Sequence, residues 1–194
     1  MSVRGLGRVK RDEAQIFVAN HQSIFDIFAI LSCVPAPVRF VAKRELARIP
    51  VLAQAMSAAG HVFIDRQDRR KASEAMRKAG ERMKRERLSL GLFPEGTRSR
   101  AGELGEFKKG TFVLAIETQV PIVPLALDGG YRVASRGRIR ASDMTLSVGV
   151  PITTEGKTAN DRDAVLETVR REIQAMLEAA RSRGESSPAT GDPE

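Results

Sequence analysis

The sequence predicts an α/β fold: a single layered domain with a mainly parallel central sheet flanked by helices. Two observations support this prediction. Short apolar runs alternate with helical segments along most of the chain, which is typical of a sheet covered by helices. The 194 residues are enough for one sizeable core and too few for two comfortable domains. We expect the domain to cover residues 1–183 and the polar residues 184–194 to form a disordered tail.

The elements can be predicted in order. The apolar run 15–19 predicts the first strand, and a helix follows it with Ser23 as the N-cap and Asp26 as the capping-box acid. Pro50 opens a short helix and Gly60 ends it. Further strands are expected at 38–42, 61–64, 88–93, 120–127 and 144–150, and helices at 51–59, 66–87, 111–118 and 161–182. The last helix is expected to cover the sheet through Leu166, Val169, Ile173, Met176 and Ala180.

The charge distribution favours an anionic partner. The net charge is +8 and the sequence pI is about 10.2. Residues 66–87 hold ten Arg or Lys against four Asp or Glu, which gives this segment a net charge of +6. Its apolar residues recur at helical spacing, so the basic residues form the outer face of an amphipathic helix. That face is either merely solvated or binds anionic lipid headgroups, at about 1 kcal/mol per basic residue.

Several classes of site and partner are not expected. No zinc-ligand spacing or aromatic RNA-binding motif accompanies the basic residues, so we predict no nucleic-acid partner. Cys33 is the single cysteine and is interpreted as a core thiol, and with two histidines the chain predicts no metal site. The longest uncharged stretch, 49–64, is shorter than the roughly 20 residues that span a bilayer. With no signal peptide either, we predict peripheral contact at the cytoplasmic side of a membrane, without a transmembrane helix.

His21 and Asp26 are candidates for an acid–base pair. Residues five apart differ by about 140° around a helix and point to opposite faces of a strand, so a bend must join them. If His21 lies in the turn between strand and helix, Asp26 can accept the proton of Nδ1. Nε2 is then free to take a proton from a substrate hydroxyl. Alternatively, Asp26 only caps the helix and His21 is an ordinary turn histidine.

A second polar cluster, 93–98, follows the predicted strand 88–93. Arg98 offers a planar, permanently charged group suited to phosphate, and Gly96 permits close approach of the backbone. Glu95 repels phosphate, so it would orient Arg98 or a substrate hydroxyl, or else pair with Arg98 for rigidity alone. The two clusters together predict a base and an anion clamp.

Four blocks, read in order, resemble the glycerolipid acyltransferase superfamily, most closely the 1-acyl-sn-glycerol-3-phosphate acyltransferases. They cover about residues 15–127. The blocks are Asn20-His21 with Asp26; 40–46 with 50, 60 and 63–66; 93–99 with 107–110; and 120–124.

The resemblance implies a role for each matching residue. His21 and Asp26 would be catalytic, and Pro121 would shape the acyl-donor side. No metal or other cofactor is implied, and the donor would be acyl-CoA or acyl-carrier protein. The acceptor phosphate would be held by Glu95, Gly96, Thr97 and Arg98, with Lys43 and Arg66 as further anion contacts or as ordinary surface charges.

The resemblance implies acyl transfer to 1-acyl-sn-glycerol-3-phosphate, a lysophospholipid, giving phosphatidic acid in phospholipid biosynthesis. Alternatives are another acceptor, such as glycerol-3-phosphate or a different lysolipid, hydrolysis of acyl esters, or a non-catalytic module that binds an anionic membrane surface. Family members often carry apolar helices before the first block. We therefore expect either that this chain meets the membrane through its basic face and exposed apolar residues, or that it is a shortened version.

Overall fold

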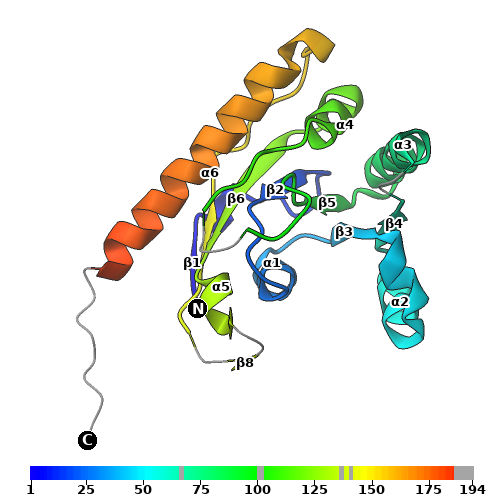
Figure 1. Ribbon diagram of the computed structural model, residues 1–194. Coiled ribbons are helices and arrows are strands. Elements are labelled where there is room, and N and C mark those ends of the chain that lie inside the picture. The colour runs from blue at the N-terminus through cyan, green and yellow to red at the C-terminus, as the bar shows by residue number, and fades with distance from the viewer. Residues whose placement is uncertain (66–67, 100–102, 136–137, 140–141, 186–194) are drawn as a thin grey trace, which may run out of the picture.

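The computed structural model describes residues 1–65, 68–99, 103–135, 138–139 and 142–185. Its centre is a seven-stranded sheet with the strand order β1-β9-β6-β2-β5-β3-β4 (Figure 1). Neighbouring strands from β6 to β4 are parallel, whereas β9 runs antiparallel to β6. The predicted α/β class with a mainly parallel sheet is confirmed.

The bounds of the elements are as follows. The strands of the main sheet are β1 (Ser2–Arg4), β2 (Ile16–Ala19), β3 (Val38–Lys43), β4 (Val62–Ile64), β5 (Ser89–Leu92), β6 (Ile122–Asp128) and β9 (Thr145–Val148). The α-helices are α1 (Phe25–Cys33), α2 (Pro50–Ala58), α3 (Arg69–Glu86), α4 (Gly110–Thr118), α5 (Gly130–Val133) and α6 (Arg162–Glu185). Short 3-10 turns are η1 (Leu6–Arg8), η2 (Arg44–Arg48) and η3 (Ala159–Asp161), and β7 (Ala134–Ser135) pairs with β8 (Arg138–Ile139).

All six predicted strands and all five predicted helices are present, with ends displaced by a few residues. The sequence did not predict β1, which lies at one edge of the sheet and pairs in parallel with β9. The first strand is therefore Ser2–Arg4 and not the run at 15–19. At the other terminus α6 continues through 184 and 185, the first two residues of the expected tail, and the remainder, 186–194, lies outside the described residues.

Two apolar cores lie on the two faces of the sheet. Successive residues of a strand point to opposite faces, so Ile16 and Val18 of β2 belong to one core and Phe17 and Ala19 to the other. The first core is covered by α3, α4 and α6, and the second by α1 and α5 (Figure 1). Since β2, β5 and β6 have both faces covered, they consist of buried residues throughout.

The covering role predicted for the last helix is confirmed, but its buried face differs from the prediction. Val169 and Ile173 are buried as expected, and Val165 and Leu177 join them, while Leu166 and Met176 pack at the margin. The buried residues recur every four positions along α6. They therefore form a row along the helix that is slightly inclined to the predicted row of buried residues.

Helix α3 has the predicted amphipathic form. Ala79 and Met83 are buried against the first core, and Asp68 caps the helix by accepting the N–H of Lys71. The described basic side chains of α3, at 70, 71, 77, 78, 82, 84 and 85, lie away from this core. None of the helices in the described part of the chain combines the length and the apolar composition needed to cross a bilayer.

Candidate functional site

The predicted site residues converge because of the sheet topology. Strands β2, β5, β3 and β4 are parallel neighbours, so their carboxyl ends lie along the same edge of the sheet. His21 follows β2, the segment 93–99 follows β5, and Lys43 ends β3. We call this edge the site edge. Arg66, which follows β4 after Asp65, lies outside the described residues.

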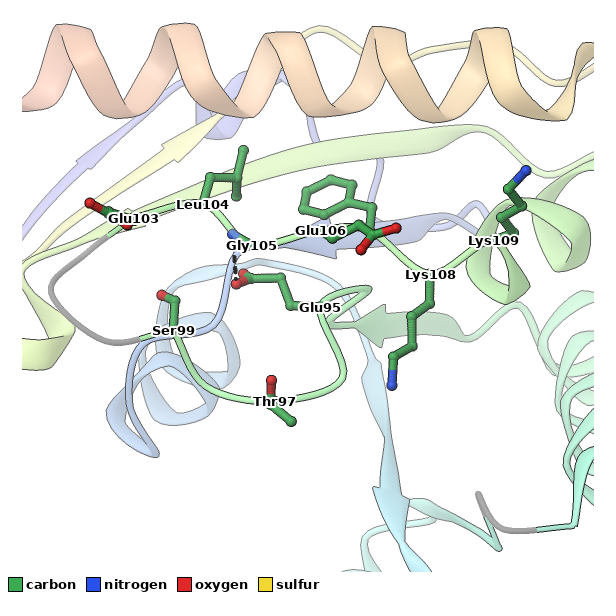
Figure 2. A pocket seen from close by; sticks show the side chains of 10 residues that line it. Glu95, Thr97, Ser99, Glu103, Leu104, Gly105, Glu106, Lys108 and Lys109 are labelled. Atoms are coloured by element: carbon green, nitrogen blue, oxygen red, sulfur yellow. Dashed lines mark hydrogen bonds between the residues drawn. The ribbon is translucent and has the colours of Figure 1, made fainter.

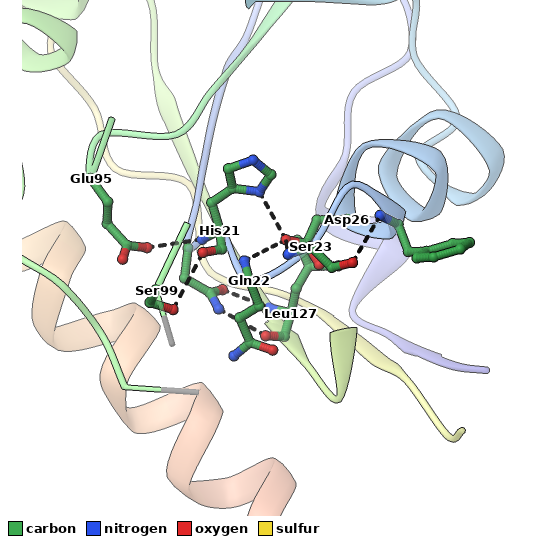
Figure 3. A network of polar contacts seen from close by, with 9 residues as sticks. His21, Gln22, Ser23, Asp26, Glu95, Ser99 and Leu127 are labelled. Atoms are coloured by element: carbon green, nitrogen blue, oxygen red, sulfur yellow. Dashed lines mark hydrogen bonds and ion pairs between the residues drawn. The ribbon is translucent and has the colours of Figure 1, made fainter. Parts of the chain in front are cut away.

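His21 and Asp26 form the predicted pair. The imidazole Nδ1 lies 2.9 Å from Asp26 Oδ2, and the Asp26 side chain is fully buried (Figure 3). The same oxygen accepts the backbone N–H groups of Gln22 and Ser23, at 2.6 and 2.7 Å. An ionised Asp26 can only accept at this oxygen, so Nδ1 carries a hydrogen, and the free lone pair of a neutral imidazole is on Nε2.

The turn that carries this pair departs from one prediction. Helix α1 begins at Phe25 and its N-cap is Ile24, so the prediction that Ser23 is the N-cap is wrong. Asp26 still binds the Ser23 N–H, which is half of a capping box. The Asp26 carboxylate therefore both closes the turn and orients the imidazole. The two interpretations of Asp26, as a helix cap and as a partner of His21, are compatible.

Aromatic stacking fixes the ring of His21 from the other side. The imidazole stacks on Phe93 at a centroid distance of 4.0 Å, and Phe93 stacks on Phe40 at 5.6 Å. Phe40 lies over Gly91 of β5, where an added Cβ would come within 2.5 Å of the ring. Held between Asp26 and Phe93, the imidazole has a single orientation and its side chain is only 13% exposed.

Asn20 anchors the same turn to the neighbouring strand. Its side-chain amide donates to the carbonyl of Leu127 and accepts the Leu127 N–H, both at 2.8 Å (Figure 3). The side-chain amide of Asn20 thus extends the hydrogen bonding between β2 and β6 by one residue, in place of a backbone peptide group. The sequence offered Asn20 only as part of the first block, and this positioning role was missed.

Glu95 joins the two polar clusters. One of its carboxylate oxygens accepts the N–H of His21 at 2.9 Å, and the other accepts the N–H of Gly105 at 3.1 Å (Figures 2 and 3). Burial raises the pKa of Glu95, and these two hydrogen bonds oppose the shift. The structure gives this carboxylate backbone partners in place of the expected Arg98. A contact between Glu95 and a substrate hydroxyl stays a prediction.

The loop with Arg98 is tied directly to His21. Ser99, the next residue, donates its N–H to the carbonyl of His21 at 2.7 Å. Thr97 and Arg98 are exposed, and the Arg98 guanidinium forms no hydrogen bond or ion pair with any residue in the described part of the chain. Gly96 has a φ of 73°, a conformation that favours glycine. The loop therefore presents a free cation beside the histidine turn.

Lys108, which the sequence offered only as part of the block 107–110, is a further cation beside this loop. A Cβ at Gly96 would come within 2.7 Å of the Lys108 ammonium nitrogen, so the two residues are in contact. Lys109, by contrast, pairs with Asp163 at 3.1 Å. The side chain of Lys108 borders a pocket of about 770 Å³ that also includes Glu95, Thr97 and Ser99 (Figure 2).

An apolar cavity of about 690 Å³ opens beside this loop. Phe93, Pro94 and Gly96 line one part of it, next to the stacked His21 ring. The remaining wall is largely apolar and comes from β3, β4, β5, α3 and α4. Its apolar members are Val41, Ile64, Ala72, Met76, Leu92, Val113 and Leu114.

Pro121 does not belong to this constellation. It precedes the first residue of β6, and its carbonyl accepts the N–H of Ile16, the first residue of β2. Both residues lie at the amino ends of parallel strands, whereas His21 follows the carboxyl end of β2. Pro121 therefore does not lie beside His21, and the expectation that it shapes the acyl-donor side stays a prediction.

Comparisons with known proteins agree with this geometry. A protein-family model described as Acyltransferase matches residues 1–128. The chain is 35% identical over 177 residues to the human 1-acyl-sn-glycerol-3-phosphate acyltransferase beta, covering 90% of this chain and 64% of that protein. It is 36% identical over 142 residues to a 1-acyl-sn-glycerol-3-phosphate acyltransferase of Cocos nucifera, covering 72% of this chain and 46% of that protein. The chain thus spans less than two thirds of the length of these relatives.

A solved structure is similar as well. The crystal structure of the 1-acyl-sn-glycerophosphate (LPA) acyltransferase PlsC from Thermotoga maritima superposes with a TM-score of 0.74 at 32% sequence identity. The match covers 90% of this chain and 71% of that one. With the histidine turn and the 93–99 loop joined at one edge of the same fold, the chain belongs to the Acyltransferase family.

Proposed function

We propose that this protein transfers a fatty acyl group from an acyl thioester, acyl-CoA or acyl-carrier protein, to the free hydroxyl of 1-acyl-sn-glycerol-3-phosphate, giving phosphatidic acid for phospholipid synthesis. One observation carries the proposal: the Nδ1 of His21 is bound to the buried carboxylate of Asp26, and the loop with Arg98 is attached to the His21 backbone. The relatives named above support the choice of acceptor.

The reaction follows from the orientation of the imidazole. Nε2 of His21 removes the proton of the acceptor hydroxyl while the oxygen attacks the thioester carbonyl. Asp26 stabilises the imidazolium that forms. The tetrahedral intermediate then collapses, the carbon–sulfur bond breaks, and the departing thiolate takes the proton from the imidazolium. The products are an ester and a free thiol, and no acyl-enzyme is formed.

The acceptor phosphate is proposed to lie against the loop 96–98. Arg98 is exposed and unpaired among the described residues, so a phosphate can bind to it without breaking an existing ion pair. Gly96 allows the anion to approach the backbone, with Thr97 offering a hydroxyl and Lys108 a second cation. Lys43 and Arg66 remain proposed as outer anion contacts.

An acyl chain is proposed to lie in the apolar cavity between α3 and α4. The cavity reaches Phe93 and Gly96, and therefore extends from the neighbourhood of His21 into apolar surroundings. Its volume of about 690 Å³ is within the usual range for a ligand pocket. The proposed reaction needs no metal ion or other cofactor, because the thioester already provides an activated acyl group. We further propose peripheral attachment to the cytoplasmic side of an anionic membrane.

The proposal is tested with purified protein, acyl-CoA and radiolabelled 1-acyl-sn-glycerol-3-phosphate, scored for phosphatidic acid. His21→Ala should lower turnover by at least 10²- to 10⁴-fold, about the contribution of a positioned general base. Cys33→Ala is the control and should keep turnover near that of the wild type, because no acyl-cysteine is formed. Wild-type turnover in a folded His21→Ala protein would refute the mechanism.

The same assay separates the alternatives. Fatty acid released without any acceptor would indicate hydrolysis. Preference for glycerol-3-phosphate or another lysolipid in an acceptor panel would keep the mechanism and change the substrate. Vesicle binding without release of thiol from acyl-CoA would favour a non-catalytic lipid-binding module.

A further inference from the structure

Helix α2 is mostly apolar although it is exposed. None of its nine residues is buried. Residues 49–60 contain no charged side chain, and the helix has only two polar side chains, Gln54 and Ser57, which lie on one narrow stripe. A helix that is apolar over most of its circumference is normally covered, yet α2 projects from the body of the protein beside β3 and β4 (Figure 1).

The exposed residues of this segment are large and apolar. Val51 is 79% exposed, Ile49 49% and Leu52 38%. On the helical wheel Val51, Leu52, Ala55 and Ala58 share the side that faces away from the protein, while the half-buried Ala53 and Met56 face toward it. We define the residues 44–59, comprising η2 and α2, as the arm.

Positive charges lie at both ends of the arm. Arg44, which pairs with Asp65 at 3.3 Å, and Arg48 are exposed on η2 immediately before α2, beside the single exposed carboxylate of Glu45. At the other end, Gly60 lies against the guanidinium groups of Arg39 and Arg82, and Arg82 belongs to the basic helix α3. Arg82 thus places the basic helix α3, part of the segment 66–87 with its net charge of +6, beside the carboxyl end of α2.

The arm is attached at the site edge. Residue 44 follows Lys43, the last residue of β3, and β3 ends beside β5, from which the Arg98 loop projects. A second exposed apolar stripe begins at the same edge, because Ile24, Phe28 and Leu31 recur along α1, which follows the His21 turn. The stripe on α1 thus starts close to His21 in the chain, and the arm starts directly after Lys43, a proposed anion contact.

We infer that the arm inserts α2 into the headgroup and upper acyl region of an anionic membrane, with α2 parallel to the surface. At nine residues the helix is about 14 Å long, too short to span a bilayer but suited to lie within its interface. Apolar burial by α2 and attraction of the flanking arginines to lipid phosphates act together in this arrangement.

Charge favours an anionic membrane over a second copy of the chain as the partner that covers α2. A two-fold contact through α2 would bring the same arginines of two copies together. Lipid phosphates complement them. The inference rests on the proposed acylation of a membrane lipid, and its consequence is that the acceptor reaches His21 without leaving the interface.

The chain has no Trp, so a single introduced Trp reports its own surroundings. Val51→Trp is the probe. Val150→Trp is the matched control, because Val150 is 55% exposed and follows β9, which ends at the opposite edge of the sheet. Fluorescence is recorded with vesicles of phosphatidylglycerol and phosphatidylcholine, and brominated lipids serve as quenchers.

With vesicles, Val51→Trp should show a blue-shifted emission and quenching by brominated lipid, and Val150→Trp should show neither. A Val51→Trp emission that stays unshifted while the protein sediments with vesicles would overturn the inference. A blue shift that grows with protein concentration in the absence of lipid would also overturn it, because a second copy would then cover α2.

A second pair of variants measures the contribution of the arm. Val51→Gln with Leu52→Gln should lower the vesicle partition coefficient by roughly tenfold or more, and Val150→Gln should leave it unchanged. Binding should be retained by His21→Ala. In the wild-type protein, absence of turnover with intact insertion would count against the proposed function alone, whereas turnover on detergent-dispersed substrate without insertion would count against the arm alone.

Discussion

The two halves of the proposed site are built differently, although both lie at the site edge. The histidine half is buried and held in place by several contacts: Asp26 Oδ2 receives three N–H groups and the imidazole is stacked on Phe93. The anion half is exposed, and Arg98 has no partner among the described residues. The comparison teaches that the fold fixes the orientation of the proposed base, whereas the proposed anion contact of Arg98 is left open to a substrate.

Asp26→Asn tests the rigid half and should have the largest effect. The amide keeps the size of the carboxylate but removes the charge that stabilises the imidazolium, so kcat should fall by about 10²- to 10⁴-fold with little change in KM. Steady-state kinetics with circular dichroism as the folding check measures this. A rise in KM with kcat preserved would show that the two halves are not separable in this way.

Arg98→Ala tests the exposed half. Loss of a charge-assisted contact to phosphate should raise KM for the phosphorylated acceptor by roughly 10- to 100-fold, with a smaller change in kcat. Arg98→Lys should be intermediate, since it keeps the charge without the planar group. Arg171→Ala, an exposed arginine of α6, is the matched control. An unchanged KM would remove Arg98 from the anion clamp.

Glu95→Gln tests the link between the halves. The Glu95 oxygens accept N–H groups on both sides, and an amide can accept only one of them, so its NH₂ group would face a donor. In urea denaturation, Glu95→Gln should lower the free energy of unfolding by about 1–3 kcal/mol. Glu167→Gln, on the exposed side of α6, should cost nothing measurable. Equal stability of the two variants would mean that the loops are held together by other contacts.

His61 should give the smallest effect, and it extends the comparison to pH. Its Nδ1 accepts the N–H of Phe40 at 2.9 Å, and burial, followed by the charge of Arg39, lowers the pKa of His61. A lowered pKa means that folding favours the neutral ring. The stability that the neutral His61 ring contributes to the folded protein is fully present above a pH of about 6.5. It is lost as the pH falls through the lowered pKa of His61.

His61→Gln keeps an acceptor for the Phe40 N–H and removes the titration. Thermal melting at a series of pH values should show that the wild type loses stability below neutrality more steeply than this variant does. Parallel curves for the two proteins would mean that the ring does not contribute to the pH dependence.

Much of the fold follows from local patterns. Apolar runs predicted every strand of the parallel part of the sheet, because both of its faces are covered. Strand β1 could not be found in this way, because three residues carry no detectable alternation and the strand exists through its pairing with β9. Likewise, the inclination of the buried row on α6 is set by the surface it covers, which the periodicity of one helix does not specify.

The site could be predicted in part. The spacing of His21 and Asp26 requires a turn, and a turn of that length brings Nδ1 to the carboxylate, so this pair was accessible from the sequence. The partner of Glu95 was not, because Gly105 contributes a backbone N–H and no side-chain signal. Lys108 and the apolar cavity also depend on how β3, α3 and α4 are packed around the loop.

Gly91 gives the aromatic stack a consequence for protein engineering. Because Gly91 has no side chain, the ring of Phe40 can lie directly against its Cα. A methyl group there would push that ring toward Phe93, and through it disturb the imidazole, without ever touching a substrate. The alignment of the proposed catalytic pair can therefore be changed by a substitution in β5, at a position that makes no proposed substrate contact.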